Sequence, residues 1–246
     1  MKEILEALRQ SDHFAELPES DLQELAASAS LRRTCKRELI YAPGHPREQV
    51  YLGLYGRTKL ARISRDGREV TLAILEAGEL FGESALVLVG KRETLAETLT
   101  SVLLLTLRAR VLQLTIERNP KILLRITRTI ARRRLLVENR LEDVAFRSVP
   151  ARLARTLLQL VKNYGVEQGS GYRLELRLTQ AEIGNLIGST RETTNHFLNE
   201  FRRGGLIQIT QHCIDILEPA KLETLGTQGA GLGELKLRPR FARATS

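Results

Sequence analysis

A long stretch without glycine sets the strictest limit on how this chain can fold. From Arg108 to Ala145 there is no glycine, and the only proline is Pro120. Proline is tolerated in the first turn of a helix, so the pattern predicts a short helix that ends near Pro120 and a second helix over about residues 121–145. At ~1.5 Å per residue, the second helix is about 37 Å long. That is longer than one compact domain needs.

Apolar residues recur along this predicted helix at spacings of three, four and seven, the seam pattern of paired helices. Arg132, Arg133 and Arg134 interrupt the seam. The alternative is that the stripe packs on the chain's own domain. The length of the helix favours pairing with a second copy, and we therefore expect a homodimer. The seam residues are Leu123, Ile126, Ile130, Val137, Leu141 and Val144.

The segment before the long helix combines two hydrophobic patterns, first a helical one and then a strand-like one. Residues 3–30 carry apolar positions at helical spacing on both sides of Pro18, which predicts two short helices. From about Leu31 onward, short apolar or alternating runs are separated by glycine turns. Asp66-Gly67 between two runs is a strong hairpin signal. Several short strands of this kind indicate a sandwich or barrel. The runs are 50–54, 59–63, 70–75, 95–100 and 102–107.

A second domain begins near Pro150, which makes the predicted fold class α+β. We expect a helix over Arg152–Tyr164, a loop over Gly165–Gly171 and a strand over Arg173–Leu178. Two helices and then short strands over Leu206–Leu217 follow. After Pro219 the chain continues into a glycine-rich, basic tail, which we expect to be loosely ordered.

Charge and composition narrow the class of protein. There are 38 Lys and Arg residues against 29 Asp and Glu residues, a formal charge of +9. Such an excess favours a polyanionic partner. The two cysteines, Cys35 and Cys213, argue against a disulfide scaffold and fit a reducing compartment. The four histidines show no metal-ligand spacing. No signal peptide opens the chain, and the longest apolar run, Val102–Leu105, is too short to cross a bilayer, so we expect a cytoplasmic protein.

Two short helices joined by a glycine turn are predicted after the alternating strand. Thr179 and Glu182 have the spacing of a capping box. Gly184 stands where a second helix can cross closely, and Gly188 allows the left-handed backbone of a tight turn. Thr190 can cap the second helix. Helices arranged in this way form a helix-turn-helix unit, whose second helix enters the major groove of DNA.

The second helix begins with Arg191 and Glu192. Arginine can donate two hydrogen bonds to guanine, and glutamate can accept one from cytosine. Asn195 and His196 lie one turn further along. The alternative is an ordinary surface Arg–Glu pair, but the glycines, the caps and the terminal strands together favour DNA reading. Basic residues suited to phosphate contacts are Arg155, Lys162, Arg202 and Arg203.

These segments resemble the cAMP receptor protein/FNR family of bacterial transcription regulators over about residues 10–220. LTQAEIG (178–184) and GSTRET (188–193) are similar to that family's helix-turn-helix, and GELFGE (78–83) is similar to its effector-pocket motif. The resemblance implies a cyclic-nucleotide-binding-like, cupin-like β-roll, a long dimerisation helix and a winged helix-turn-helix. The expected bounds are 1–120 for the β-roll with its N-terminal helices, 121–146 for the dimerisation helix, 147–225 for the winged helix-turn-helix and 226–246 for a flexible tail.

The resemblance also implies a homodimer on palindromic double-stranded DNA, with RNA polymerase as a further partner. The family's third base-reading position, usually Arg, falls on His196, and its usual Arg at the start of the unit falls on Gln180. Both changes remove fixed positive charge, so we expect a different preferred operator. The candidate DNA-binding residues are Thr179, Gln180, Thr190, Arg191, Glu192, Asn195 and His196.

The resemblance is partial in the effector pocket. In cAMP-binding members, a Gly-Glu pair holds the ribose and an Arg-Ser pair holds the cyclic phosphate. Gly82-Glu83 and Arg92 match, but Glu93 replaces the serine and would bring negative charge towards a phosphate. The Thr-Ser pair that binds adenine falls on Val137 and Glu138, and a valine side chain cannot hydrogen-bond. The candidate effector residues are Gly82, Glu83, Ser84, Arg92, Glu93, Arg133, Val137 and Glu138.

Three alternatives stay open for the effector. The first is cAMP. The second is another small molecule, such as an organic acid held by Arg92 and Arg133. In the third, the regulator is constitutive and the Gly82-Glu83 turn is only structural. In the effector-controlled case, we expect the β-roll to set the angle of the long helix through a hinge at Phe146–Pro150.

Two other functional classes are alternatives to a transcription regulator. A nucleotide-binding module of an enzyme or channel is disfavoured, since no catalytic pairing, phosphate-cradling glycine loop or membrane segment is visible. We therefore expect no enzymatic activity. A nucleic-acid binder without sequence preference would explain the charge, but it would not explain the base-reading residues.

Overall fold

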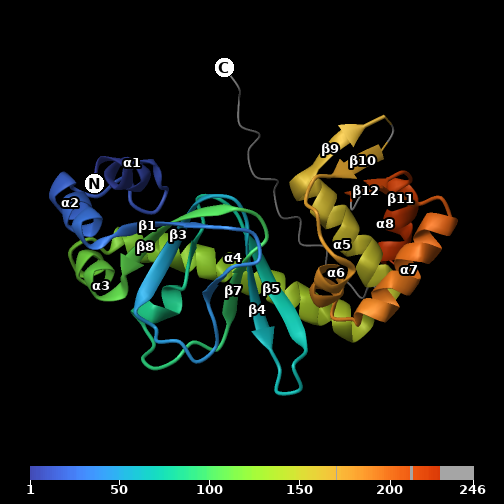
Figure 1. The fold of residues 1–246 in the computed structure, drawn as a ribbon, viewed down its shortest axis with the longest axis horizontal. Helices are drawn as coiled ribbons and strands as arrows, with labels where there is room; N and C mark the ends of the chain where they lie inside the picture. Colours follow the sequence, from blue (N-terminus) through green and yellow to red (C-terminus); the bar gives the residue numbers. More distant parts are fainter. Residues whose placement is uncertain (170, 211–212, 228–246) are drawn as a thin grey trace. The chain divides into compact units, whose positions relative to one another are not determined.

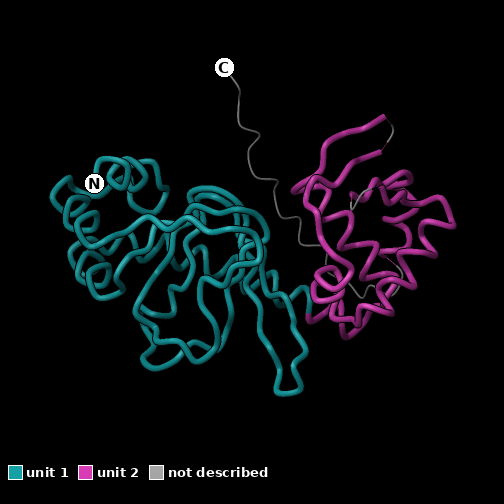
Figure 2. The backbone as a smooth tube through the Cα atoms, in the orientation of Figure 1, with its two compact units in different colours: residues 1–140 teal, residues 141–246 magenta. Residues whose placement is uncertain are grey.

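The computed structural model describes residues 1–169, 171–210 and 213–227. The chain divides into two compact units, residues 1–140 and 141–246 (Figure 2). The boundary falls within one long helix, α4 (Lys121–Phe146). The prediction of a single helix over about 121–145 is therefore confirmed.

The first unit is a β-roll with helices at its N-terminal end (Figure 1). Two antiparallel four-stranded sheets have the strand orders β1-β8-β3-β6 and β2-β7-β4-β5. Pairing of β1 with β8 brings the two ends of the roll together. The elements are α1 (Lys2–Gln10), α2 (Glu19–Ser28), β1 (Ser30–Thr34), β2 (Leu39–Tyr41), β3 (Gln49–Tyr55), β4 (Thr58–Ile63), β5 (Glu69–Leu75), β6 (Leu80–Phe81), the 3-10 helix η1 (Glu83–Leu86), β7 (Leu95–Thr98), β8 (Val102–Arg108) and α3 (Ala109–Arg118).

The hairpin predicted at Asp66-Gly67 joins β4 to β5. Gly67 has a φ of +81°, where a residue with a Cβ atom is strained. The two predicted N-terminal helices are also confirmed. They pack with α3 and the start of α4 in one core that includes Leu8, Phe14, Leu25 and Leu112. This core lies between the sheets and the helical layer, so it fixes α4 on the roll.

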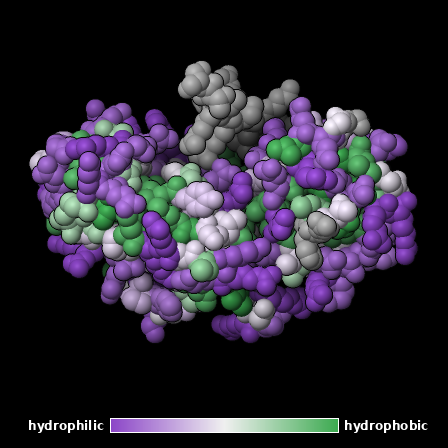
Figure 3. Space-filling model, turned by 45° about the horizontal axis from the view of Figure 1, so that its top comes forward, coloured by the Kyte–Doolittle hydropathy of each residue, from purple (hydrophilic) through white to green (hydrophobic). Residues whose placement is uncertain are grey.

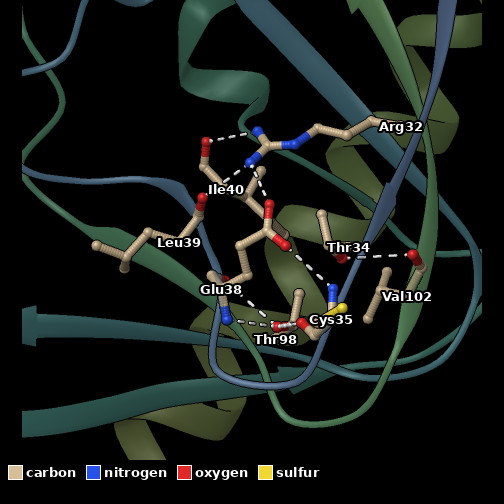
Figure 4. A network of polar contacts seen from close by, with 8 residues as sticks. All are labelled: Arg32, Thr34, Cys35, Glu38, Leu39, Ile40, Thr98 and Val102. Atoms are coloured by element: carbon tan, nitrogen blue, oxygen red, sulfur yellow. Dashed lines mark hydrogen bonds and ion pairs between the residues drawn. The ribbon is translucent and has the colours of Figure 1, made fainter.

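A polar network fixes the turn between β1 and β2 (Figure 4). The carboxylate of Glu38 accepts hydrogen bonds from the Cys35 N–H at 3.0 Å and from the Arg32 guanidinium at 3.1 Å. The Thr98 hydroxyl on β7 donates to the Cys35 carbonyl at 2.5 Å. The Cys35 N–H and, to a lesser extent, Arg32 lower the pKa of Glu38. The network therefore ties the end of one sheet to the other.

In its described residues, the second unit contains four helices, the last turn of α4 and a four-stranded sheet with the order β11-β12-β10-β9. Two helices, α6 and α7, are joined by a short turn. The elements are α5 (Val149–Tyr164), β9 (Gly165–Gln168), β10 (Gly171–Leu174), α6 (Gln180–Ile187), α7 (Arg191–Arg203), β11 (Ile207–Thr210), β12 (Cys213–Ile216) and α8 (Pro219–Thr227).

Three sequence expectations for this unit were wrong. The predicted loop over 165–171 contains β9, and the strand predicted over 173–178 is β10, which begins and ends earlier. The pairing partners decide these limits, because Leu174 is the last β10 residue opposite β9 and β12. Helix α8 was missed. It packs on α5 with Leu222 fully buried. The predicted flexible tail, 226–246, lies outside the described residues except for the last two residues of α8.

The seam of α4 is exposed at every predicted position except one. Leu123, Ile130, Val137, Leu141 and Val144 are exposed large apolar residues. Ile126 is buried in the core of the first unit, so its assignment to the seam was wrong, because that turn of α4 packs against its own N-terminal layer. On the face drawn in Figure 3, apolar residues interrupt a mainly hydrophilic surface. None of the described helices has the length and hydropathy of a membrane-spanning segment.

Candidate nucleic-acid interface and effector site

Helices α6 and α7 begin with the side-chain caps that the sequence predicts. The Thr179 hydroxyl accepts a hydrogen bond from the Glu182 N–H at 3.2 Å, and the Glu182 carboxylate accepts one from the Thr179 N–H at 2.6 Å. The Thr190 hydroxyl accepts from the Thr193 N–H at 3.2 Å. Each cap satisfies backbone donors that have no partner within the helix. Local sequence therefore sets where both helices start.

The two glycines of this unit act as predicted. A Cβ atom on Gly184 would lie 2.9 Å from the Ser189 carbonyl oxygen and 3.1 Å from the Thr194 hydroxyl, so α7 crosses α6 where only glycine fits. Gly188 ends α6 with a φ of +64°, in the left-handed region. A Cβ atom there would also meet Val144 of α4, at 3.3 Å. The turn thus needs glycine for its backbone and for its contacts.

Helix α7 presents one polar face to solvent. It buries Thr194, Leu198 and Phe201, and this leaves Arg191, Glu192 and His196 exposed. An exposed arginine and glutamate in the first turn of such a helix can reach base edges in the major groove. The face therefore offers both a bidentate donor and an acceptor.

Two further candidate residues lie together across the helix pair. The Asn195 side-chain oxygen accepts hydrogen bonds from the Gln180 amide at 2.8 Å and from the Asn199 amide at 3.1 Å. Gln180 is thus engaged with α7, which limits how far it can reach toward a phosphate. His196 Nε2 lies 3.5 Å from a carboxylate oxygen of Glu200, so a carboxylate stands beside the position where the resembling family usually has arginine.

The effector candidates of the first unit lie around Gly82 and Arg92. Gly82 has a φ of +75°, and a Cβ atom on it would lie 3.2 Å from Nη1 of Arg92. Arg92 is only 4% exposed. Its guanidinium stacks 4.0 Å from the centre of the Tyr41 ring and donates a 2.5 Å hydrogen bond to the Gln49 carbonyl. Within the described part of the chain, its contacts are rings and a carbonyl instead of a carboxylate.

Aromatic residues that the sequence analysis did not single out fill the space beside Arg92. Tyr51 and Phe81 stack with ring centres 5.2 Å apart, and Tyr41 lies 5.7 Å from Tyr51. Burial is the main cause that raises the pKa of Tyr41 and Tyr51, and Arg92 partly opposes it. Only folding brings these three strands together, so spacing in the sequence offers no signal for the cluster.

Arg133 of α4 reaches the same Gly82-Glu83 segment from the other side. Its Nη1 lies 3.3 Å from the Glu83 carboxylate, and its Nη2 donates to the Leu80 carbonyl. Its Nε is buried and has no hydrogen-bond partner among the residues that the structure describes, and the same holds for the Thr71 hydroxyl of β5. Buried polar atoms without partners are costly unless another group satisfies them. Two arginines therefore lie near one turn, and one of them, Arg133, has a buried N–H without a partner among the described residues.

The remaining effector candidates point elsewhere. The Glu93 carboxylate is at the surface, with its side chain 64% exposed and 3.0 Å from Arg62. Arg92 is buried, so the two neighbouring side chains lie in different environments, and the expected effect of Glu93 on a phosphate beside Arg92 stays a prediction. Glu138 pairs with Arg134 at 2.7 Å on the surface of α4, and Ser84 lies in η1.

Comparisons with known proteins match both units. Residues 31–119 match the cyclic nucleotide-binding domain family, and residues 151–225 match the Crp-like helix-turn-helix domain family. A CRP-like cAMP-activated global transcriptional regulator of Mycobacterium tuberculosis is 34% identical over 183 residues, which cover 74% of this chain and 82% of that protein. A global nitrogen regulator of Synechocystis is 33% identical over 190 residues, 76% of this chain and 84% of that protein.

A solved structure has a similar fold over most of this chain. The c-di-GMP-responsive global regulator of Xanthomonas campestris aligns with a TM-score of 0.73 at 25% identity, over 81% of this chain and 99% of that one. The order of a nucleotide-binding-type roll followed by a helix-turn-helix is thus common to this chain and to these regulators.

Proposed function

Because this chain belongs to the Crp/Fnr family of DNA-binding transcription regulators, we propose that it works as a homodimer that binds inverted-repeat operators and answers to a small anionic effector. The proposal places it in the bacterial cytoplasm, with RNA polymerase as a further partner and without catalytic activity of its own. The observation that carries the operator proposal is the exposed Arg191 and Glu192 at the capped start of α7.

The DNA proposal follows from the chemistry of the α7 face. Arg191 can donate to guanine O6 and N7, and Glu192 can accept from cytosine N4. Neither side chain belongs to the buried face of the helix. Thr179 and Thr190 are occupied as caps, so their role is to hold the helices.

The dimer proposal rests on the exposed seam of α4. Five large apolar side chains along one helix are exposed in a single chain, and Leu141 is 69% exposed. Covering them with a second α4 would bury apolar surface on both copies, at about 25 cal/mol per Å². Two α7 helices would then face successive major grooves, about 34 Å apart on one side of the duplex.

The effector proposal rests on Arg92. A buried guanidinium without a carboxylate partner is costly, and an anion between Arg92 and Arg133 would relieve that cost. Relatives carry names that include cAMP-activated and c-di-GMP-responsive, and both of these effectors are anions. Val137 cannot hydrogen-bond to adenine, which favours an organic acid over cAMP. A constitutive regulator in which Arg92 has only a structural role is the alternative.

Competition on DNA tests the operator proposal. An inverted repeat selected by the protein from a random pool is labelled and challenged with unlabelled bulk DNA. We expect bulk DNA to compete poorly, by a factor of about 10³ or more at fixed salt. Equal competition would instead support a nucleic-acid binder without sequence preference, with a steep dependence on salt.

The mass of the protein in solution tests the dimer proposal. Wild type should be a dimer, and Leu141→Glu should shift the mass toward the monomer because it places a charge in the seam. Val89→Glu is the matched control, since Val89 is an exposed apolar residue in the loop after η1 and is not part of α4. A wild-type monomer at working concentration, or equal effects of both substitutions, would contradict the proposal.

A further inference from the structure

One arginine joins the C-terminal ends of two helices in the second unit. Arg152 lies in the first turns of α5. Its Nε donates to the Ile187 carbonyl at 2.8 Å, its Nη1 to the Arg147 carbonyl at 2.9 Å and its Nη2 approaches the Gly188 carbonyl at 3.4 Å. Ile187 is the last residue of α6, Gly188 is its cap, and Arg147 directly follows α4. The guanidinium therefore bridges the end of α4 and the turn that precedes α7.

The chemistry of this bridge suits arginine specifically. The last carbonyls of a helix lack partners within the helix and carry negative partial charge. A guanidinium presents five donors in a rigid plane, whereas a lysine ammonium is a single point charge. Burial lowers the pKa of Arg152, in keeping with a group partly withdrawn from water. Arg152 can thus hold three carbonyl groups in one geometry.

Further contacts fix Arg147, whose carbonyl Arg152 holds, to the last turn of α4 and bring that turn close to Gly188. Arg147 is buried, and its Nε lies 2.7 Å from the Asp143 carboxylate in the last turn of α4. Val144, in that turn, is the residue that a Cβ atom on Gly188 would meet at 3.3 Å. All of these residues belong to the unit that begins at Leu141. The last turn of α4 is therefore attached to the turn of the helix-turn-helix at two points.

We propose that Arg152 is a positioning residue for DNA recognition: it makes the last turn of α4 and the turn before α7 a single piece. The orientation of α7 then follows this last turn of α4, whose residues belong to the same compact unit. This inference rests on the proposed function, since only a dimer on an inverted repeat has two recognition helices whose separation matters.

The spacing of operator half-sites tests the proposal. Three duplexes are used: the inverted repeat selected by the wild type, the same repeat with one base pair added between the half-sites, and a single half-site. One added base pair moves a half-site by about 3.4 Å and rotates it by about 35°. We expect wild type to lose about ten-fold in affinity on the lengthened repeat and Arg152→Gln to lose only about two-fold, with unchanged affinity for the single half-site.

Control variants separate positioning from simple stabilisation. Arg155→Gln removes a cation that lies 3.5 Å from the same Asp143 carboxylate and has no bond to α6, so it should keep the wild-type spacing preference. Arg152→Lys should retain only part of the spacing preference that Arg152→Gln loses. An Arg152→Gln protein that discriminates spacing like wild type, or that loses the single half-site as well, would overturn the proposal.

A second variant covers the case in which Arg152→Gln melts too low to assay. Asp143→Asn releases Arg147 without touching the carbonyls of α6, and the same loss of spacing discrimination is expected from it; full discrimination in Asp143→Asn would refute the idea. A wild-type protein with no preference for any inverted repeat is a different result, since it refutes the proposed function.

Discussion

The proposed base recognition depends on single side chains of α7, and Arg191 is the sharpest case. Its guanidinium is exposed at the start of the helix. Arg191→Ala should cost about 1–3 kcal/mol per half-site and relax the preference at one base pair. Binding selection on a randomised operator measures both effects. Arg202→Ala is the matched control, because loss of a phosphate contact weakens all sequences alike.

A buried histidine should make the first unit sensitive to acid. His13 is 7% exposed, and burial lowers its pKa, helped by Arg133 and Arg125 and opposed by Asp12. The unfolded chain then takes up a proton at a higher pH than the folded chain. Stability is therefore unaffected well above the ordinary pKa of 6.5 and falls as the pH drops below it.

The histidine prediction is checked by urea unfolding at several pH values. Between about pH 7 and pH 5, His13→Gln should lose stability less steeply than wild type. Equal slopes for the two proteins would show that the acid sensitivity of the fold has another origin. The comparison uses slopes, so an overall loss of stability in the variant does not disturb it.

At the scale of elements, the turn between α6 and α7 combines two demands on Gly188. Alanine there is strained by the positive φ and also meets Val144. Gly205 offers a matched control, since its φ is +68° and a Cβ atom on it would meet nothing within 4 Å. Gly205→Ala should cost about 1–2 kcal/mol from backbone strain alone. Gly188→Ala should cost more, and Val144→Ala should recover part of the difference in denaturant unfolding.

Secondary structure was predictable where a local signal exists. Some features depend only on residues a few positions apart, so the sequence predicts them. They are the caps at Thr179 and Thr190, the left-handed glycines and the hairpin at Asp66-Gly67. Helix α8 was missed for the opposite reason, because its apolar contact is with α5, which is distant in the sequence. Strand β9 pairs with its sequence neighbour β10, but its mostly exposed residues have no strand periodicity to read.

At the scale of the whole molecule, effector binding should appear as a rise in stability. Melting of the full-length protein is followed with cAMP, cyclic di-GMP and a set of small di- and tricarboxylates. A ligand that binds only the folded state at 100 times its Kd adds about 2.7 kcal/mol. Arg92→Gln should abolish the shift and Arg133→Gln should reduce it, whereas Glu93→Gln, at the surface, should leave it in place. No shift with any compound would favour the constitutive alternative.

The family, the α+β architecture, the long helix and the exposed polar face of α7 all follow from the order of residues along the chain. They depend on period, caps and glycines, whose physics is local. The partners of a charged side chain are a different matter. That Arg92 is buried against Tyr41, that Ile126 faces its own core and that Arg152 joins two helix ends are outcomes of packing between distant segments. Burial and pairing are properties of the folded chain, because the same arginine is a solvated cation or a structural bridge according to what surrounds it.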